Sequence, residues 1–226
     1  RALHTPRRRQ RQMCIRDRGT IRRAGIKNIT IISNQFIGQI AKHVGSGLPG
    51  EKIHYVLEET PEGVANALNL ARPHNENCRL LVYFSDNITT IELAEHVERF
   101  TAQETNPGCL LLSRDEENPH AFGVAKFDTN GNIIDIVEKP DDPPSNIAIG
   151  GIYLFDEQFW ALVDECYSEH GSNFSITDVN RKYVHQGQAE LLNIGKETWI
   201  DCGTPDSLLS AALMAKAGKL DPNPFK

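Results

Sequence analysis

Short, uninterrupted apolar segments alternate along the chain with segments of helical periodicity. Residues 29–33 (ITIIS) and 80–84 (LLVYF) are apolar nearly throughout and rich in strand-forming residues. Strands that are buried on both faces have this composition, which is typical of a parallel sheet covered by helices. Further strands of this kind are expected at residues 53–57 and 109–113. Helices are expected at residues 35–44, 63–71 and 91–103, the last one capped by Thr90.

The second half of the chain predicts a mixture of hairpin, strand and helix. Residues 122–127 and 133–137 predict a hairpin, because Asn130-Gly131 between them can adopt the positive φ angles of a tight turn. Further elements are expected as strands at 147–155 and 190–194, and as helices at 157–167, 176–186 and 207–217. Together they predict an α/β fold, with a mixed but mostly parallel sheet, helices on both faces and an antiparallel insertion.

Composition and cysteine content fit a single globular protein. The 226 residues are 39% hydrophobic and 24% charged, which is enough to bury a substantial core. No apolar run approaches the roughly 18 residues that cross a membrane, so we expect no membrane partner. The five cysteines are scattered, form no CxxC pair and accompany no visible secretory signal. They predict reduced thiols in a cytoplasmic protein.

Positive charge is concentrated at the start of the chain. Residues 1–23 contain nine arginines and one acidic residue, which gives this segment a charge of +8. Because the net charge of the whole chain is −6, residues 24–226 carry a charge of −14. Such a segment can be a functional basic arm, a solvated tail or a foreign extension. Residues 8–17 resemble translated adapter sequence. We therefore expect residues 1–20 to be a foreign or disordered extension, residues 21–226 to form the domain, and nucleic acid not to be a partner.

Asp86 and Asp201 are the carboxylates best placed for chemistry. Asp86 directly follows the strand at 80–84, and ligands of open α/β sheets bind beyond the carboxyl ends of strands. Asp201 stands at a strand-to-turn junction, where Gly203 permits a sharp turn. Two carboxylates that converge from separate strands suit a Mg²⁺ ion carrying substrate phosphates. The alternative is structural: Asp86 caps a following helix and Asp201 opens a turn.

Two weaker signals lie at other strand ends. Lys139 ends the second hairpin strand, where its charge can either neutralise phosphate or simply face solvent. Residues 60–63 (TPEG) lie between a strand and a helix, where backbone N–H groups and the helix dipole favour an anion or a base edge. No Ser–His–Asp or Cys–His arrangement can be assigned.

Six short motifs occur in the order found in sugar-1-phosphate nucleotidyltransferases. They are PEGVANA (61–67), SDN (85–87), FGV (122–124), VEKP (137–140), ITDVN (176–180) and WIDCGT (199–204). The ordered set is far more specific than any one of its members. Over about residues 21–218 the chain resembles this family, and within it the glucose-1-phosphate thymidylyltransferases. The resemblance implies a Rossmann-like nucleotidyltransferase fold.

The resemblance also implies a reaction and a set of site residues. The reaction joins a nucleoside triphosphate and a sugar 1-phosphate, here dTTP and glucose 1-phosphate, into a nucleotide sugar and releases pyrophosphate. Asp86 and Asp201 would hold Mg²⁺ and act in catalysis together with Lys139. Gly63 would approach the base, and Gly123, Glu138 and Lys139 would contact the sugar or its phosphate. Further substrate contacts are implied for Glu58, Phe122, Tyr153 and Trp199, and a homo-oligomer is implied as well.

The chain departs from the family pattern at several places. The family opens with a strand and a G-G-x-G-T-R-L loop that wraps the triphosphate, and the basic segment stands where this first βα unit is expected. Glu58 replaces a base-reading Gln and cannot donate a hydrogen bond to a pyrimidine carbonyl. Phe122 replaces a Tyr, and residues 171–175 lack the usual Arg and Glu.

These departures lead us to expect an incomplete copy with weak or no activity. Two other kinds of protein remain as alternatives. A metal-dependent glycosyltransferase of related fold would also place an Asp after a central strand, although usually as D-x-D. A non-catalytic sensor would bind the nucleotide sugar without turning it over. The sequence leaves the base and the sugar open.

Overall fold

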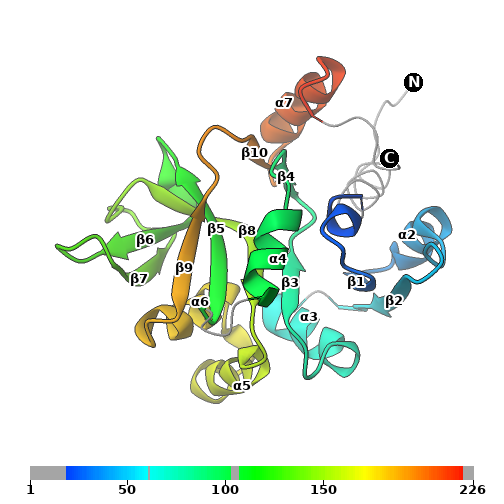
Figure 1. Ribbon diagram of the computed structural model, residues 1–226, viewed down its shortest axis with the longest axis horizontal. Coiled ribbons are helices and arrows are strands. Elements are labelled where there is room, and N and C mark those ends of the chain that lie inside the picture. The colour runs from blue at the N-terminus through cyan, green and yellow to red at the C-terminus, as the bar shows by residue number, and fades with distance from the viewer. Residues whose placement is uncertain (1–18, 61, 103–106, 221–226) are drawn as a thin grey trace.

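The computed structural model describes residues 19–60, 62–102 and 107–220. Its centre is a six-stranded sheet in the order β7-β6-β8-β5-β9, with β3 also paired to β8 (Figure 1). The strands of this sheet are β3 (Leu80–Tyr83), β5 (Cys109–Asp115), β6 (Gly123–Phe127), β7 (Ile133–Glu138), β8 (Ile147–Phe155) and β9 (Ala189–Asn193). All six lie at the predicted positions, which confirms the mixed α/β fold.

The expectation that most neighbouring strands are parallel is wrong. Strand β8 runs antiparallel to β3, β5 and β6, and in this sheet only β5 and β9 pair in parallel. The apolar runs indicated burial on both faces, and helices on both faces bury an antiparallel strand equally well. Strand β8 illustrates this, because eight of its nine residues are buried.

Helices cover both faces of the sheet, as predicted. On one face α4 (Ala94–Ala102) packs Phe100 against Leu110 and Leu154. On the other face α5 (Phe159–His170) and α6 (Ile176–His185) enclose Leu111 and Phe155. Successive strand residues point to opposite faces, so each strand contributes to both cores.

The first described strands form a separate small sheet. Strand β1 (Asn28–Ser33) pairs in parallel with β2 (Lys52–Leu57), and α2 (Ile37–Val44) connects them. Helix α3 (Val64–Ala71) follows and buries Ala65 and Leu68 in the core shared with α5 and α6. Figure 1 shows this sheet beside the central one, on the side away from the β6–β7 hairpin.

Two three-residue strands received no bounds from the sequence, although a strand was expected to end at Asp201. Strands β4 (Asn87–Thr89) and β10 (Trp199–Asp201) pair in antiparallel fashion and lie just below α7 (Pro205–Lys216) (Figure 1). They also change the start of α4, which begins at Ala94 instead of following a cap at Thr90. The Thr90 hydroxyl donates to Glu197 and accepts from the backbone N–H of Thr198.

Two further predictions concern residues 1–20 and membrane-spanning helices. The predicted extension at residues 1–20 lies outside the described residues, apart from Gly19 and Thr20, which are helical and buried. Among the described residues, no helix combines the length and the apolar character needed to cross a bilayer.

The aromatic centre of the core gives a stability prediction. Phe155 is fully buried and its ring lies 4.5 Å from that of Phe159 and 5.6 Å from that of Tyr183. We expect Phe155→Ala to lower the free energy of unfolding by about 3–5 kcal/mol, because it leaves a cavity between these rings. Urea titration measures this. Leu209→Ala, at a side chain that is 59% exposed, is the control and should change stability by less than about 0.5 kcal/mol.

Candidate active site

The β4–β10 pair brings Asp86 and Asp201 together. Asp201 is opposite Asn87 in the ladder, and the backbone N–H of Cys202 donates to the carbonyl of Asp86 over 2.8 Å. Two segments that are far apart in sequence thus meet at residues 86 and 202. Asp86 is one partner of this hydrogen bond, and Asp201 directly precedes the other partner. The predicted convergence of the two aspartates is present in the structure. The alternative for Asp86 is wrong, because a strand and not a helix follows it.

Asn87 fixes the orientation of the Asp86 carboxylate. Its side-chain amide is almost fully buried, and the Nδ2 group donates to Asp86 Oδ1 over 2.7 Å. Its Oδ1 accepts from Gly151 N at 2.9 Å and from Trp199 Nε1 at 2.7 Å. Sequence analysis missed this role. The signal was an amide side chain directly after the candidate ligand, although nothing in the sequence gives its three partners.

Two adjacent glycines of β8 make room for this arrangement. A Cβ on Gly151 would lie 2.6 Å from Asn87 Nδ2, and a Cβ on Gly150 would lie 3.2 Å from the Trp199 ring. The first distance is far too short for any side chain. The Gly-Gly pair in the middle of a buried strand therefore marks the place where the site approaches the central sheet.

The electrostatics of the pair favour a cation. Burial and the nearby Asp201 carboxylate both raise the pKa of Asp86, and the hydrogen bond from Asn87 opposes them. Asp201 Oδ1 accepts from Gly203 N over 2.8 Å, so the turn interpretation also holds for this residue. Two carboxylates are hard oxygen donors of the kind that Mg²⁺ prefers. No cluster of three or more metal-ligating side chains occurs among the described residues, so a metal here would keep several ligands from substrate or water.

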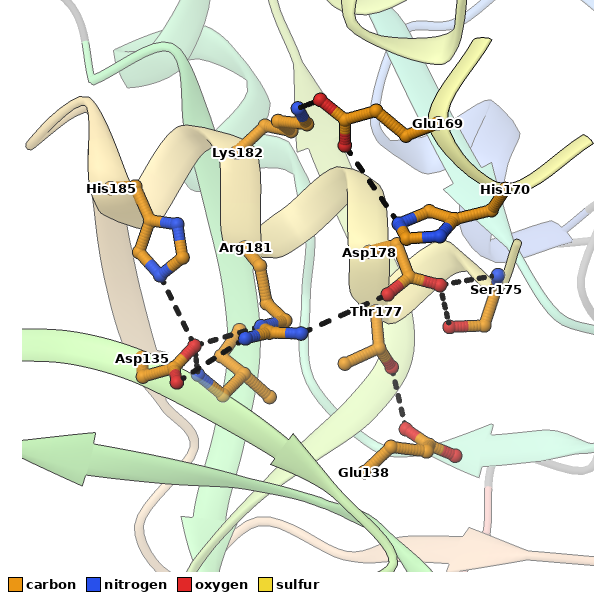
Figure 2. Close-up of polar contacts among 11 residues, drawn as sticks. Asp135, Glu138, Glu169, His170, Ser175, Thr177, Asp178, Arg181, Lys182 and His185 are labelled. Carbon is orange, nitrogen blue, oxygen red and sulfur yellow. Dashed lines mark hydrogen bonds and ion pairs between the residues drawn. The ribbon is translucent and has the colours of Figure 1, made fainter. Parts of the chain in front are cut away.

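A second group of predicted residues lies at the start of the hairpin. Gly123 is opposite Glu138 in the β6–β7 ladder, and the Glu138 carboxylate accepts from the Thr177 hydroxyl over 2.6 Å (Figure 2). Lys139 has a φ of 44°, which is rare for a residue with a side chain, and its N–H donates to the carbonyl of Phe122. Its Nζ lies 3.8 Å from Glu138 Oε1, and its side chain is well exposed.

Tyr153 lies between the two groups. It is buried on β8, and its pKa is raised by burial and by the carboxylates of Glu138 and Asp86. The phenol is therefore a neutral hydrogen-bond donor at ordinary pH. Tyr153 therefore lies near enough to feel the charge of both carboxylates and connects the hairpin group with the aspartate pair.

Aromatic rings close the side of this site. The rings of Phe122 and Trp199 lie 5.2 Å apart. The Arg114 guanidinium lies over the Trp199 ring, 4.7 Å from its centre. Trp199 is buried, so it serves as packing for the aspartate turn and as a donor to Asn87.

Glu58 and Gly63 lie further along, at the end of β2 and the start of α3. Gly63 has a φ of 97° and precedes the first residue of α3. Glu58 Oε1 accepts from Asn66 Nδ2 over 3.1 Å. Val64, which directly follows Gly63, belongs to the same hydrophobic cluster as Phe84 and Tyr153. This packing connects the start of α3 to the rest of the site.

Comparison with known proteins identifies the class. The nucleotidyl transferase family model matches residues 10–217. The chain belongs to this family.

Several curated relatives of the chain are named for a particular nucleotidyltransferase reaction. The chain is 29% identical over 193 residues to the low-salt glycan biosynthesis nucleotidyltransferase Agl11 of Haloferax volcanii, matching 84% of this chain and 54% of that protein. It is 29% identical to a glucose-1-phosphate thymidylyltransferase of Mycolicibacterium smegmatis (85% and 67%) and 32% identical to one of Xanthomonas campestris (84% and 65%). The chain thus spans about half to two thirds of the length of these relatives.

Solved structures agree on the fold. A Bacillus anthracis protein assigned as a glucose-1-phosphate thymidylyltransferase, in complex with sucrose, superposes with a TM-score of 0.82 at 30% identity, covering 90% of this chain and 82% of that one. An apo UDP-glucose pyrophosphorylase superposes with a TM-score of 0.75 at 16% identity (92% and 88%), which shows the shared fold alone.

The raised pKa of Asp86 gives a prediction about pH and stability. An Asp whose pKa is higher in the folded than in the unfolded chain destabilises the fold as pH rises from the ordinary value of 3.8 through the folded value. Asp86→Asn removes this penalty. Since solvent partly screens the site, we expect a gain of about 0.5 kcal/mol near neutral pH, and none below about pH 3.5.

Urea titrations at several pH values measure this difference. Asp142→Asn, at an exposed position outside the helices and strands, is the control for the loss of one surface carboxylate. A gain that is equal at all pH values would mean that the charge of Asp86 is not the cause.

Proposed function

We propose that the site of this chain is that of a sugar-1-phosphate nucleotidyltransferase, which joins glucose 1-phosphate and dTTP into dTDP-glucose and pyrophosphate, and that the 226-residue chain itself turns these substrates over weakly or not at all. The observation that carries the proposal is the pairing of β4 with β10, which joins Asp86 to the residue after Asp201 by a backbone hydrogen bond and brings the charge of Asp201 near the Asp86 carboxylate. Relatives named as thymidylyltransferases support the choice of substrates. A cytoplasmic location and a homo-oligomer belong to the same proposal.

The two aspartates would hold Mg²⁺, whose chemistry when bound is to neutralise the phosphates of the substrates. Burial, together with the charge of Asp201, raises the pKa of Asp86, and both make a cation beside this pair favourable. Lys139 adds a side-chain charge on the hairpin side, where we place the phosphate of the sugar. The remaining residues bind and orient.

In the proposed reaction an oxygen of the sugar phosphate attacks the α-phosphorus of the nucleotide in line. The bond from that phosphorus to the bridging oxygen breaks, and pyrophosphate leaves with the electron pair. The chain has no covalent step to perform, so its contribution is positioning. Glu138 accepts from a sugar hydroxyl, Gly123 admits the sugar close to the backbone, and the neutral Tyr153 hydroxyl lies between the sugar and the aspartates. Phe122 and Trp199 exclude water from one side.

The base site would lie at Glu58 and Gly63. A carboxylate accepts from the N3–H of a pyrimidine but repels the neighbouring carbonyl oxygens. Asn66 already donates to Glu58 Oε1, so the pair offers the base an acceptor in a fixed orientation.

The first prediction concerns turnover. The sequence contains no G-G-x-G-T-R-L segment to bind the triphosphate, so we expect the 226-residue chain to release little pyrophosphate from dTTP and glucose 1-phosphate. It should still bind dTDP-glucose in a Mg²⁺-dependent manner. Asp86→Asn and Asp201→Asn should each weaken that binding by about 100-fold, and Asp206→Asn should not. Calorimetry with Mg²⁺ or EDTA measures binding.

The other kinds of protein give different results. Binding of dTDP-glucose that is strong and independent of Mg²⁺ and of both aspartates indicates a sensor. Transfer of glucose to an acceptor without pyrophosphate indicates a glycosyltransferase. Turnover near that of an intact relative would overturn the expectation of weak activity.

A further prediction concerns the base. Glu58→Gln supplies an N–H donor while its Oε1 can still accept from Asn66. We expect the variant to bind dTTP about fivefold more tightly, a gain of the size of one hydrogen bond. Glu59→Gln, at the exposed neighbouring position, is the matched control. Unchanged or weaker binding by Glu58→Gln would show that Glu58 does not face the base.

A further inference from the structure

Strand β10, which leads into Asp201, is paired along one edge only. Among the described strands its sole neighbour is β4, and each of the two has three residues. Thr198 and Cys202 make backbone hydrogen bonds toward the β4 side. Because such bonds alternate along an antiparallel strand, the carbonyl of Trp199 points away from β4. A two-stranded sheet is marginal by itself, so contacts at the other edge help to fix Asp201.

Arg114 makes such a contact at the other edge. It lies near the end of β5 in the central sheet, opposite Ala148 of β8. Its Nη1 donates to the carbonyl of Trp199 over 2.5 Å, and its guanidinium lies 4.7 Å from the centre of the Trp199 ring. One side chain from the central sheet therefore contacts both the backbone and the ring of the residue two positions before Asp201.

Glu116 orients the guanidinium of Arg114. It accepts a hydrogen bond from Arg114 Nη2, and the two side chains are only 19% and 27% exposed, so solvent screens this ion pair less than a surface pair. The Nε group of Arg114 is buried and has no hydrogen-bond partner among the described residues. An unsatisfied donor reduces stability, which indicates that this arginine is placed for its contact with Trp199.

Trp199 transmits this restraint to both aspartates. Along the backbone, its position determines where Asp201 lies two residues later. Through the ring, its Nε1 donates to Asn87 Oδ1 over 2.7 Å, and Asn87 in turn donates to Asp86. The ring also packs closely on β8, where a Cβ on Gly150 would lie only 3.2 Å from it. A shift of Trp199 would therefore displace both carboxylates.

We propose that Arg114 is a positioning residue for the aspartate pair, because it holds Trp199 at the edge of β10 that faces away from β4 and thereby fixes the geometry in which the two aspartates meet a Mg²⁺ ion. Arg114 acts through Trp199 and has no contact with the ion. The planar guanidinium can donate to a carbonyl and a carboxylate while it stacks on a ring, which a lysine cannot do. This inference rests on the proposed function, in which the aspartates hold Mg²⁺.

The test uses the different geometric demands of two ions. Mg²⁺ requires nearly octahedral ligands at short distances, whereas the larger Ca²⁺ accepts irregular arrangements. Calorimetry gives the concentration of each ion at which dTDP-glucose binding is half-maximal. In Arg114→Met this concentration should rise about tenfold for Mg²⁺ and less than about twofold for Ca²⁺, because the residue that orients the ligands is lost.

Two further variants separate geometry from general stability. Arg99→Met breaks an exposed ion pair with Glu190 and should change neither concentration. Arg114→Lys keeps the charge but loses the stacked fork, so we expect a shift of about threefold for Mg²⁺ and none for Ca²⁺. Equal shifts for both ions in Arg114→Met would mean that Arg114 only stabilises the fold. That result, or the absence of a Mg²⁺ shift, overturns the inference.

Fluorescence tests the contact without any ligand. The sequence has two tryptophans, so Trp160→Phe leaves Trp199 as the reporter. In this background Arg114→Met should shift the Trp199 emission to longer wavelength and increase its quenching by acrylamide, because a buried ring loses the group that covers one of its faces. Unchanged emission and quenching would show that Arg114 does not hold Trp199.

The outcomes also separate this inference from the proposed function. If the unaltered chain does not bind dTDP-glucose with either ion, the proposed function is wrong and the role of Arg114 is wrong with it. If binding requires Mg²⁺ and is weakened in Asp86→Asn but not in Arg114→Met, only the positioning role is overturned. Thermal unfolding confirms that each variant is folded. If Arg114→Met is not, Arg114→Lys takes its place in the same comparison.

Discussion

The site depends on one buried amide. Asn87 donates to Asp86 and accepts from Trp199 and from the backbone of Gly151, so a single side chain ties the first aspartate, the turn of the second aspartate and the central strand β8 together. The bonds from Gly151 and Trp199 are buried, where an unpaired partner would be costly. The orientation of the carboxylate is therefore set by the fold before any ligand binds, and the glycines of β8 are needed because no larger residue leaves room for the amide.

Preorganisation of this kind keeps like charges close together. Burial and, to a smaller extent, the charge of Asp201 raise the pKa of Asp86, and Glu138 adds a third carboxylate near the buried Tyr153 hydroxyl. Within the described residues the fold offsets this charge only in part, through the Asn87 amide, the Thr177 hydroxyl and the distant Nζ of Lys139. A ligand that brings a divalent cation relieves the repulsion, so the arrangement that costs stability is the same one that would provide affinity.

Much of the architecture could be predicted from the sequence, because long elements have clear periodicity. The nine residues of β8 and the Asn130-Gly131 hairpin were predicted at nearly their observed bounds. Strand β4 was not predicted, and β10 was expected only as a strand that ends at Asp201, since three residues are too few to show a period. Their pairing is nevertheless what joins Asp86 to Asp201. The aspartates were found from the ends of apolar runs and from the family motifs. Asn87 and Thr177 stand in the same motifs, but they act through contacts with segments that are far away in sequence, which the motifs do not reveal.

The direction of β8 explains why those contacts could not be inferred. If β8 ran parallel to its neighbours, a crossover connection would have to join them, and the β6–β7 hairpin would not pair with β8 as it does. Because β8 instead runs antiparallel to β3 and to β6, the end of β3 and the start of β6 meet along the same edge, at residues 149–152. Asp86 follows the first strand and Gly123 begins the second. The long central strand is thus the element that brings the aspartate pair and the start of the hairpin together, and its two glycines stand where these two groups meet.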